Sequence, residues 1–150
     1  GYVCVSPATS PENVFSVQGK ECGVAKSAAM SDAIVRELFT NYLRATEVLH
    51  IEEPLRAKVK ALLPRVKPYA IGSKGQLLEW DQEYEECEPT HRHCSHLYGL
   101  HPAHEITPDG TPELAKAARR SLELRGDEGT GWSLGWKSIS GRAWARAITR

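Results

Sequence analysis

The sequence predicts a mainly α-helical protein whose long ordered loops carry its most unusual residues. Apolar residues recur at helical spacing over residues 31–63, and a third helical segment with clear start and stop signals begins at Thr111. The connecting regions hold clustered histidines, glycines and tryptophans without sustained periodicity. The chain has 150 residues, of which 41% are hydrophobic and 25% charged, so it can bury one core.

The first predicted helix follows an irregular stretch, residues 1–30, and covers about residues 31–49. Ser31 is placed to cap the first turn, and Asp32 suits the positive end of the helix. The apolar stripe expected to face the core consists of Ile34, Val35, Leu38, Phe39, Tyr42 and Leu49.

A second helix is expected over about residues 53–63. Pro54 occupies the tolerated first turn, and Pro64 and Pro68 end the segment. A short polar link joins it to the first helix, which predicts an antiparallel helical hairpin. The residues expected to face inward are Leu55, Val59, Leu62 and Leu63.

Residues 64–110 are expected to be mostly loops. Residues 71–80 look like a turn or hairpin, and we expect strands to be short and confined to residues 1–8 or 70–80. Residues 81–88 hold five carboxylates and no basic residue, which is typical of a solvated face or loop.

The third helix is predicted over residues 112–125. Thr111 is its cap, Pro112 its first residue and Gly126 its stop, and three alanines on it would allow close approach of a neighbour. A fourth helix is expected from about Trp132 to Ile148, although two glycines weaken it. The alanines are Ala115, Ala117 and Ala118, and the glycines are Gly135 and Gly141.

The composition excludes several classes of function. Nineteen basic and nineteen acidic side chains cancel, so no global field attracts nucleic acid or an anionic membrane. No apolar run is long enough for a transmembrane helix, and residues 1–7 show no secretory signal. The four cysteines match no zinc or redox spacing, which favours free or buried thiols: Cys4, Cys22, Cys87 and Cys94.

The densest chemical signal is the histidine cluster. His91, His93, Cys94 and His96 are zinc-type ligands, but the paired second half of a structural zinc site is missing. A second interpretation is that these histidines have no ligand and are either hydrogen-bonded inside the protein or exposed on its surface. The favoured one is a polar pocket in which imidazole and guanidinium donors meet hydroxyl groups.

Two tryptophans support the pocket. Trp80 is flanked by carboxylates, and Trp132 lies in a glycine-rich loop, which is unusual for core residues. A flat apolar ring beside hydrogen-bonding groups is what a sugar needs. Trp136 and Trp144 lie on a helix face and are interpreted as core. Glu12, in a loop stiffened by proline, matters only if the fold brings it to the histidines.

Five blocks follow one another in a recognisable order. They are SPEN at 10–13, MSDAIVRELF at 30–39, IGSKGQLLEW at 71–80, HRHCSHLYGLHP at 91–102 and RGDEGTGWSLGWK at 125–137. The series resembles the glycoside hydrolase family 95 α-L-fucosidases over about residues 5–137. The sequence strays from the family after Lys137.

The resemblance implies part of an (α/α)6 barrel and inverting hydrolysis of terminal α-L-fucosyl residues, α-1,2-linked in particular. It matches Glu12 to the general acid, for which an environment that raises the carboxyl pKa is expected. The pocket should hold the substrate-binding residues Glu79, Trp80, His91, His93, His96 and Trp132. The expected partner is a fucosylated glycan, with no cofactor or metal, outside the cell, in the periplasm or at the cell surface.

The family's upstream asparagine pair, which handles the water, and its downstream aspartate are absent from this chain. Twelve helices of about 11–12 residues need well over 200 residues. Residues 1–150 are therefore expected to be a partial catalytic domain, inactive alone, that lacks upstream and downstream portions. The alternatives are an inactive carbohydrate-binding remnant and a metal-stabilised all-α interaction module.

Overall fold

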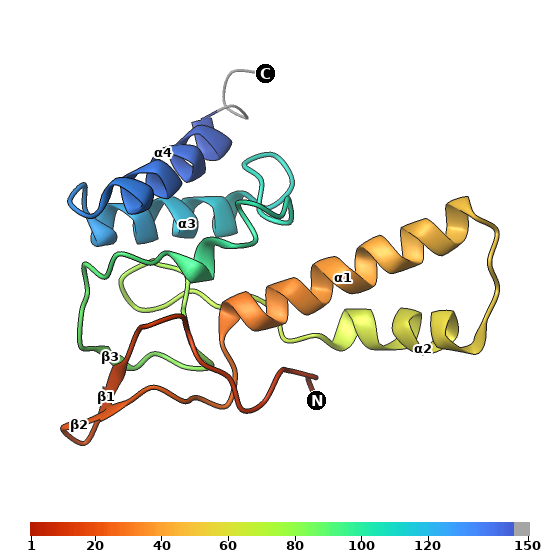
Figure 1. Cartoon of the computed structure of the whole chain (residues 1–150), viewed down its shortest axis with the longest axis horizontal. Helices are drawn as coiled ribbons and strands as arrows, with labels where there is room; N and C mark the ends of the chain where they lie inside the picture. Colours follow the sequence, from red (N-terminus) through yellow and green to blue (C-terminus); the bar gives the residue numbers. More distant parts are fainter. Residues whose placement is uncertain (146–150) are drawn as a thin grey trace.

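The computed structural model describes the backbone of residues 1–145 and the side chains of residues 1–142. It confirms a mainly helical protein: a body of two helices, loops and a small sheet, from which a helical hairpin projects (Figure 1). The helices are α1 (Ala29–Val48), α2 (Pro54–Leu62), α3 (Pro112–Arg125) and α4 (Gly131–Ala145), with short 3-10 turns η1 (Leu63–Arg65) and η2 (Ser95–Leu97). The strands are β1 (Phe15–Val17), β2 (Lys20–Cys22) and β3 (Glu85–Glu86).

The predicted hairpin is confirmed as α1 and α2, which pack side by side and point away from the body (Figure 1). α1 begins two residues before Ser31, so Ser31 is not its cap; Ala28 holds that position with extended backbone. Asp32 instead accepts hydrogen bonds from the Val5 N–H, at 2.9 Å, and from the Ser27 hydroxyl. The start of α1 is therefore tied to the N-terminal segment.

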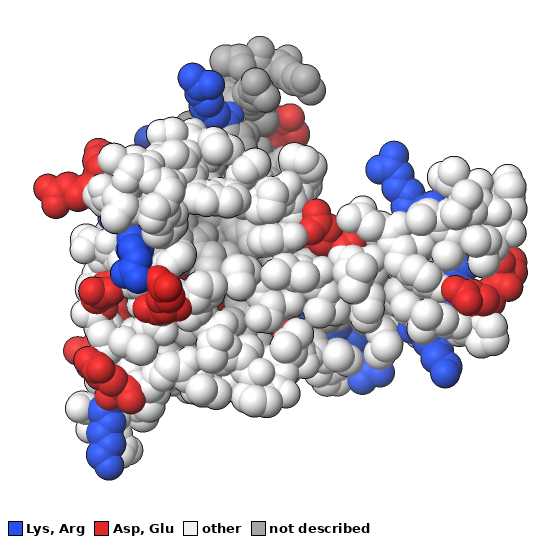
Figure 2. Space-filling model, in the orientation of Figure 1, with Lys and Arg blue, Asp and Glu red and all other residues white. Residues whose placement is uncertain are grey.

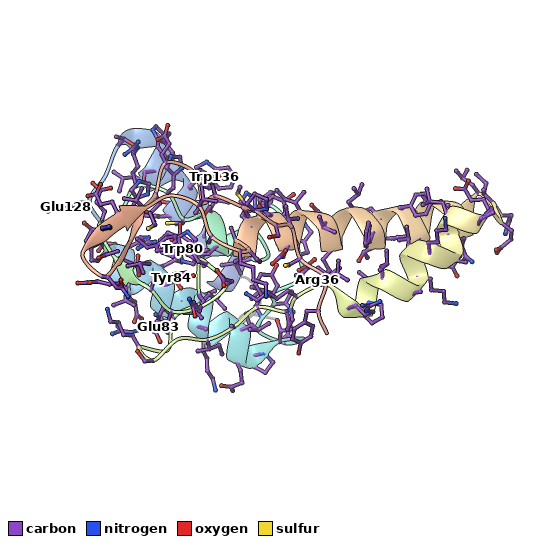
Figure 3. All side chains as sticks on the ribbon, turned by 90° about the horizontal axis from the view of Figure 1, so that it is seen from below. Arg36, Trp80, Glu83, Tyr84, Glu128 and Trp136 are labelled. Atoms are coloured by element: carbon purple, nitrogen blue, oxygen red, sulfur yellow. The ribbon has the colours of Figure 1, made fainter. Side chains whose placement is uncertain are left out.

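Much of the apolar stripe predicted to be core is exposed. Val59 is buried as expected, but the hairpin stands clear of the body and covers only its own inner side (Figure 1). The exposed members of the predicted inward faces are Ile34, Leu38, Leu49 and Leu55. At its base, α1 carries Arg36 (Figure 3), which forms an ion pair with Glu105 at 2.8 Å. The Tyr98 hydroxyl donates a hydrogen bond to Glu37 of the same helix at 2.6 Å.

The strands lie where none was predicted. β1 and β2 form an antiparallel hairpin through Gln18 and Gly19, whose positive φ angles of 52° and 75° suit a two-residue turn. β3 comes from the acidic segment and pairs with the other edge of β1. Residues 1–8 and 70–80 contribute only isolated bridges, among them Ile71 with Leu77 in the predicted turn.

α3 has the predicted bounds, with Thr111 before it and Gly126 after it. Thr111 does not cap the helix N–H groups with its side chain, because its hydroxyl oxygen accepts from the Thr107 N–H at 2.9 Å. The three alanines of α3 are buried against loop residues Leu77, Leu97, Leu100 and Ile106. α4 packs across α3 (Figure 1); the end predicted near Ile148 lies outside the described residues.

The remaining sequence predictions concern surface chemistry. All four cysteines are free thiols, as expected. The acidic segment 81–88 is mostly exposed, except that Glu86 reaches a buried arginine. On the face shown in Figure 2, the middle of the surface consists mostly of uncharged residues, and most charged side chains lie toward the edges. None of the helices in the described part of the chain is long and apolar enough to cross a membrane.

Candidate active site

The fold brings Glu12 to the histidine cluster, from about eighty positions away in the sequence. Glu12 sits in a tight loop with φ of 53°, and its side chain is 62% exposed. Its carboxylate accepts hydrogen bonds from the Arg92 guanidinium and, at 3.0 Å, from Nε2 of His93. Glu12, Arg92 and His93 therefore form one exposed polar group.

His91 fixes the distance between the Glu12 loop and His93. Its ring is buried, and Nε2 lies 3.1 Å from the Glu12 carbonyl oxygen, to which it can only donate. Nδ1 accepts the His93 backbone N–H at 3.1 Å, so the ring carries its proton on Nε2 and is neutral. Burial lowers the pKa of His91, which keeps it in this form at neutral pH.

Glu79 lies beneath the loop rather than in the pocket. It is 5% exposed, and its Oε1 accepts hydrogen bonds from the Ser10 hydroxyl and from Nδ2 of Asn13 at 3.1 Å, the residues on either side of the loop that carries Glu12. Ser95, from the histidine block, approaches the same oxygen at 3.4 Å. Glu79 shares a small cavity with Trp80 and His96 on the inner side of the loop, and its part in substrate binding stays a prediction.

The charge of Glu79 is balanced by Arg125. Oε2 of Glu79 lies 2.5 Å from the Arg125 guanidinium and 3.4 Å from Nδ1 of His96. Burial opposes ionisation of Glu79, but the charges of His96 and Arg125 and the hydrogen bonds it accepts lower its pKa overall. Burial lowers the pKa of His96 to about 4, so Arg125 is the counter-ion at neutral pH.

Trp80 belongs to the core, contrary to the prediction that it walls the pocket. It is 3% exposed and packs against Phe15, with ring centroids 5.0 Å apart, and against Tyr84 at 6.4 Å. Figure 3 shows Trp80 and Tyr84 beside one another inside the body, apart from Trp136. The indole has no free face on which a sugar could stack.

An open pocket of about 260 Å³ lies next to the Glu12 loop, between η2 and α4. Trp132 is 46% exposed at one end, with its ring 4.8 Å from that of His93. The walls are mostly apolar, whereas a polar pocket was expected. They consist of Pro11, Met30, His93, Cys94, Ser95, Tyr98, His101, Pro102, Trp132, Trp136 and Ser140.

Comparison with known proteins decides the family. The family model described as "Glycosyl hydrolase family 95 catalytic domain" matches residues 1–149. The chain belongs to glycosyl hydrolase family 95. It is 41% identical over 148 residues to "Alpha-L-fucosidase 2" of Arabidopsis thaliana, covering 97% of this chain and 17% of that protein.

Two fungal relatives of the family are more distant. "Probable alpha-fucosidase A" of Aspergillus niger is 28% identical over 149 residues, covering 92% of this chain and 18% of the relative. The Aspergillus oryzae protein of the same name is 28% identical over 159 residues, covering 97% and 20%. This family 95 chain thus spans about a fifth or less of the length of these relatives.

The environment of Glu12 in this family 95 chain is the opposite of the one expected for a resting general acid. Hydrogen bonds from His93 and Arg92, with the charge of Arg92, lower the pKa of the carboxyl group. Among the described residues, the hydrogen-bond partners of this carboxylate are Arg92 and His93, neither of them acidic, and its side chain is open to water. Glu12 is therefore ionised at neutral pH in the unliganded chain.

The metal interpretation has no geometric support. Among the described residues, no three His, Cys, Asp or Glu side chains converge as ligands. His91 and His93 are engaged by Glu12, whereas His96 faces Glu79, so the cluster divides between a pocket edge and a buried network.

Sequence reasoning missed the far end of the pocket. Trp136, interpreted as core, is 44% exposed and lies beside His101, with ring centroids 5.2 Å apart. The side chain of Trp144, also interpreted as core, lies outside the described residues. The four-residue spacing of Trp132, Trp136 and Ser140 on one helix was the signal that could have revealed a shared pocket-facing side.

Proposed function

We propose that the full protein is an α-L-fucosidase that hydrolyses terminal α-L-fucosyl residues, α-1,2-linked in particular, with inversion of configuration. This chain would be one part of an (α/α)6-barrel catalytic domain and would supply the general acid, Glu12, and part of the sugar pocket. The observation that carries the proposal is the position of Glu12 beside the open pocket in a family 95 catalytic-domain chain.

Each residue at the pocket edge has a chemical task in this proposal. Glu12 protonates the departing glycosidic oxygen, while Arg92 and His93 donate hydrogen bonds to sugar hydroxyls. Trp132 offers an exposed indole face to the apolar side of the sugar ring. Glu79, His91, His96 and the buried Trp80 hold these groups in place from behind.

Inversion also needs a water activated on the opposite side of the sugar. The asparagine pair and the aspartate that the family resemblance implies for this task are not among the residues of this sequence. We propose that other segments of the longer protein supply that machinery, so residues 1–150 alone release no fucose. Because fucosylated glycans are mostly extracellular, we propose that the full protein works outside the cell, in the periplasm or at the cell surface.

Glu12 must carry a proton to act as the general acid, so its pKa has to rise when substrate binds. A sugar seated over the carboxylate would exclude water, and its hydroxyl groups would compete for Arg92. Loss of water and loss of the positive partner both raise a carboxyl pKa. In this proposal the glycan itself brings Glu12 into its acid form.

Replacing Arg92 by leucine in the full-length protein tests this coupling. Arg92 lowers the pKa of Glu12, so its removal raises that pKa, and the protonated acid persists to higher pH. The alkaline limb of kcat/KM, which reports the free enzyme, should move to higher pH. The limb of kcat should move less, because bound substrate has already displaced Arg92. A limb of kcat/KM that stays in place or moves to lower pH contradicts the coupling.

The reaction itself is tested on the purified full-length protein with an α-1,2-linked fucosyl disaccharide. Proton NMR during the first minutes should show β-L-fucose before its α anomer, because inversion changes the configuration once. First appearance of the α anomer refutes inversion, and cleavage of other linkages alone refutes the linkage preference. The ionised Glu12 favours one rival function, a carbohydrate-binding site without turnover, for which binding of the disaccharide without fucose release is the expected result.

A further inference from the structure

We propose that Ser133, a buried serine in the first turn of α4, is a positioning residue for the general acid: its hydroxyl group holds the main chain of Arg92, so that the Arg92 guanidinium meets the Glu12 carboxylate. The inference rests on the proposed function and adds to it the residue that places the charged partner of the acid. One hydrogen bond carries it, in which the Ser133 hydroxyl donates to the Arg92 carbonyl oxygen at 2.6 Å from 41 positions away in the sequence.

The segment that carries Arg92 has little main-chain support of its own. Arg92 lies at a bend between β3 and η2, where the chain forms neither helix nor strand. In the part of the chain that the structure describes, neither its N–H nor its carbonyl oxygen bonds to another main-chain group. Its side chain is 42% exposed, so close packing does not fix it either. The bond from Ser133 is therefore the one through which the fold holds the main chain of this residue.

The environment of Ser133 suits this task. Ser133 is 0% exposed, whereas its neighbours Trp132 and Leu134 on the same helix are exposed. A buried hydroxyl group without a partner costs free energy, so a serine at this position needs the Arg92 oxygen. Gly129 provides the space, because a Cβ atom there would lie 3.1 Å from the Ser133 hydroxyl oxygen, and its φ of 150° favours glycine.

A second side chain of α4 fixes the helix against the end of α3. Lys137 lies one turn after Ser133, on the same side of α4. Its Nζ donates to the carbonyl oxygens of Arg125 at 3.2 Å, Gly126 at 2.9 Å and Glu128 at 2.8 Å. A positive charge also suits the negative end of α3. α4 is thus held in place where its first turn meets the histidine block.

The first turn of α4 contacts both hydrogen-bond donors of the Glu12 carboxylate. Ser133 holds Arg92, and the neighbouring Trp132 packs on His93 with ring centroids 4.8 Å apart. Arg92 and His93 are the two residues whose side chains donate to Glu12. Two consecutive residues of the helix therefore place two consecutive residues of the histidine block, and Ser133 acts on the charged one.

The consequence for catalysis comes from the charge of Arg92. Hydrogen bonds from Arg92 and His93, and the charge of Arg92, lower the pKa of Glu12, whereas His91 bonds only to the Glu12 main chain. From α4, Lys137 is directed to α3 instead. An Arg92 whose main chain is no longer held stabilises the ionised carboxylate less, which raises the pKa of Glu12 and lets the acid form persist to higher pH.

The test is the pH dependence of hydrolysis of an α-1,2-linked fucosyl disaccharide by the full-length protein and its Ser133→Ala variant. The alkaline limb of kcat/KM should move to higher pH by about 0.4–1 pH unit, which corresponds to the net value of one hydrogen bond. The limb of kcat should move less, because bound substrate has already displaced Arg92. The position of a limb does not depend on how much of the variant is folded. A limb of kcat/KM that stays in place or moves to lower pH overturns the inference.

Two single variants are the controls. Ser133→Thr keeps the hydroxyl group, and Gly129 leaves room beside it, so the limb should stay close to its wild-type position. A shift as large as that of Ser133→Ala would contradict a role of the hydroxyl group. Ser138→Ala removes an exposed serine of the same helix and should leave the limb unchanged. An equal shift there would contradict a role specific to Ser133.

The double variant Ser133→Ala with Arg92→Leu shows whether Ser133 acts through Arg92. Once the guanidinium is absent, loss of the Ser133 hydroxyl should move the limb no further than Arg92→Leu alone, because the two changes remove the same interaction. A further shift as large as that of Ser133→Ala alone overturns the assignment.

Failure of the proposed function looks different. A wild-type protein that neither cleaves nor binds any fucosyl probe refutes the function, and the role of Ser133 with it. An active wild-type protein whose Ser133→Ala variant keeps the same pH profile refutes the role of Ser133 alone.

Discussion

Replacing Glu12 by glutamine in the full-length protein is expected to slow hydrolysis of an unactivated fucosyl disaccharide by about 10²–10⁴-fold, the range typical of a general acid. The amide keeps the size of the side chain and can still contact Arg92, but it has no proton to deliver to the departing oxygen. Binding of the disaccharide, measured by calorimetry, should persist.

A substrate with an activated leaving group separates lost acid catalysis from a disturbed site. An aryl fucoside departs as a stable phenolate and needs little protonation, so Glu12→Gln should slow it far less. Glu85→Gln, an exposed carboxylate on β3, is the matched control and should leave both rates unchanged. Equal losses on both substrates, or no loss on either, would remove Glu12 from the acid role.

Replacing Glu79 by alanine is expected to destabilise the protein by about 3 kcal/mol, the lower end of the cost of breaking a buried ion pair, because Arg125 keeps a second ion pair with Glu86. Arg125 is as buried as Glu79, and in the variant its guanidinium would retain, among the described residues, Glu86 and the Pro89 carbonyl oxygen, at 2.7 Å, as partners. Denaturant unfolding of the full-length protein measures the change in the free energy of unfolding.

Two comparison variants show whether the charge or merely the volume of Glu79 matters. The double variant Glu79→Leu with Arg125→Met removes both charges and should be clearly more stable than Glu79→Ala, because no buried charge stays unpaired. Glu113→Ala removes an exposed partner of Lys116 and should cost no more than about 1 kcal/mol. A loss of stability for Glu79→Ala as small as that for Glu113→Ala would contradict the buried-pair interpretation.

The Glu79 network also explains how one exposed carboxylate is positioned. Ser10 and Asn13 bind the same oxygen of Glu79, and Glu12 lies between them with a backbone conformation that costs energy for a residue other than glycine. His91 holds the Glu12 carbonyl oxygen from the opposite side. The loop is thus fixed by two buried groups, neither of which reaches the pocket.

The sequence by itself determined the elements whose signals are local. Thr111, Pro112 and Gly126 delimit α3 because helix starts and stops depend on the backbone of one turn. The hairpin of α1 and α2 follows from periodicity and from Pro54 in the same way. The five motif blocks identified the family because residue types and their order need no coordinates.

The sequence carries only a weak signal for the hairpin of β1 and β2. Gln18 and Gly19 form its two-residue turn, but the flanking strands are only three residues long, too short for alternation to be evident. β3 had no local signal at all, since the acidic segment pairs only because β1 offers it an edge.

Only the tertiary structure decided which aromatic rings are buried. Trp80, between carboxylates, is covered by Phe15 and Tyr84 from other segments, whereas Trp136, on a helix, meets open space beside His101. Burial depends on what packs against a ring, and the neighbours in sequence do not fix that. The charge state of Glu12 was likewise decided in three dimensions, because a carboxyl pKa follows from the groups within hydrogen-bond reach, and Arg92 and His93 reach Glu12 only in the folded chain.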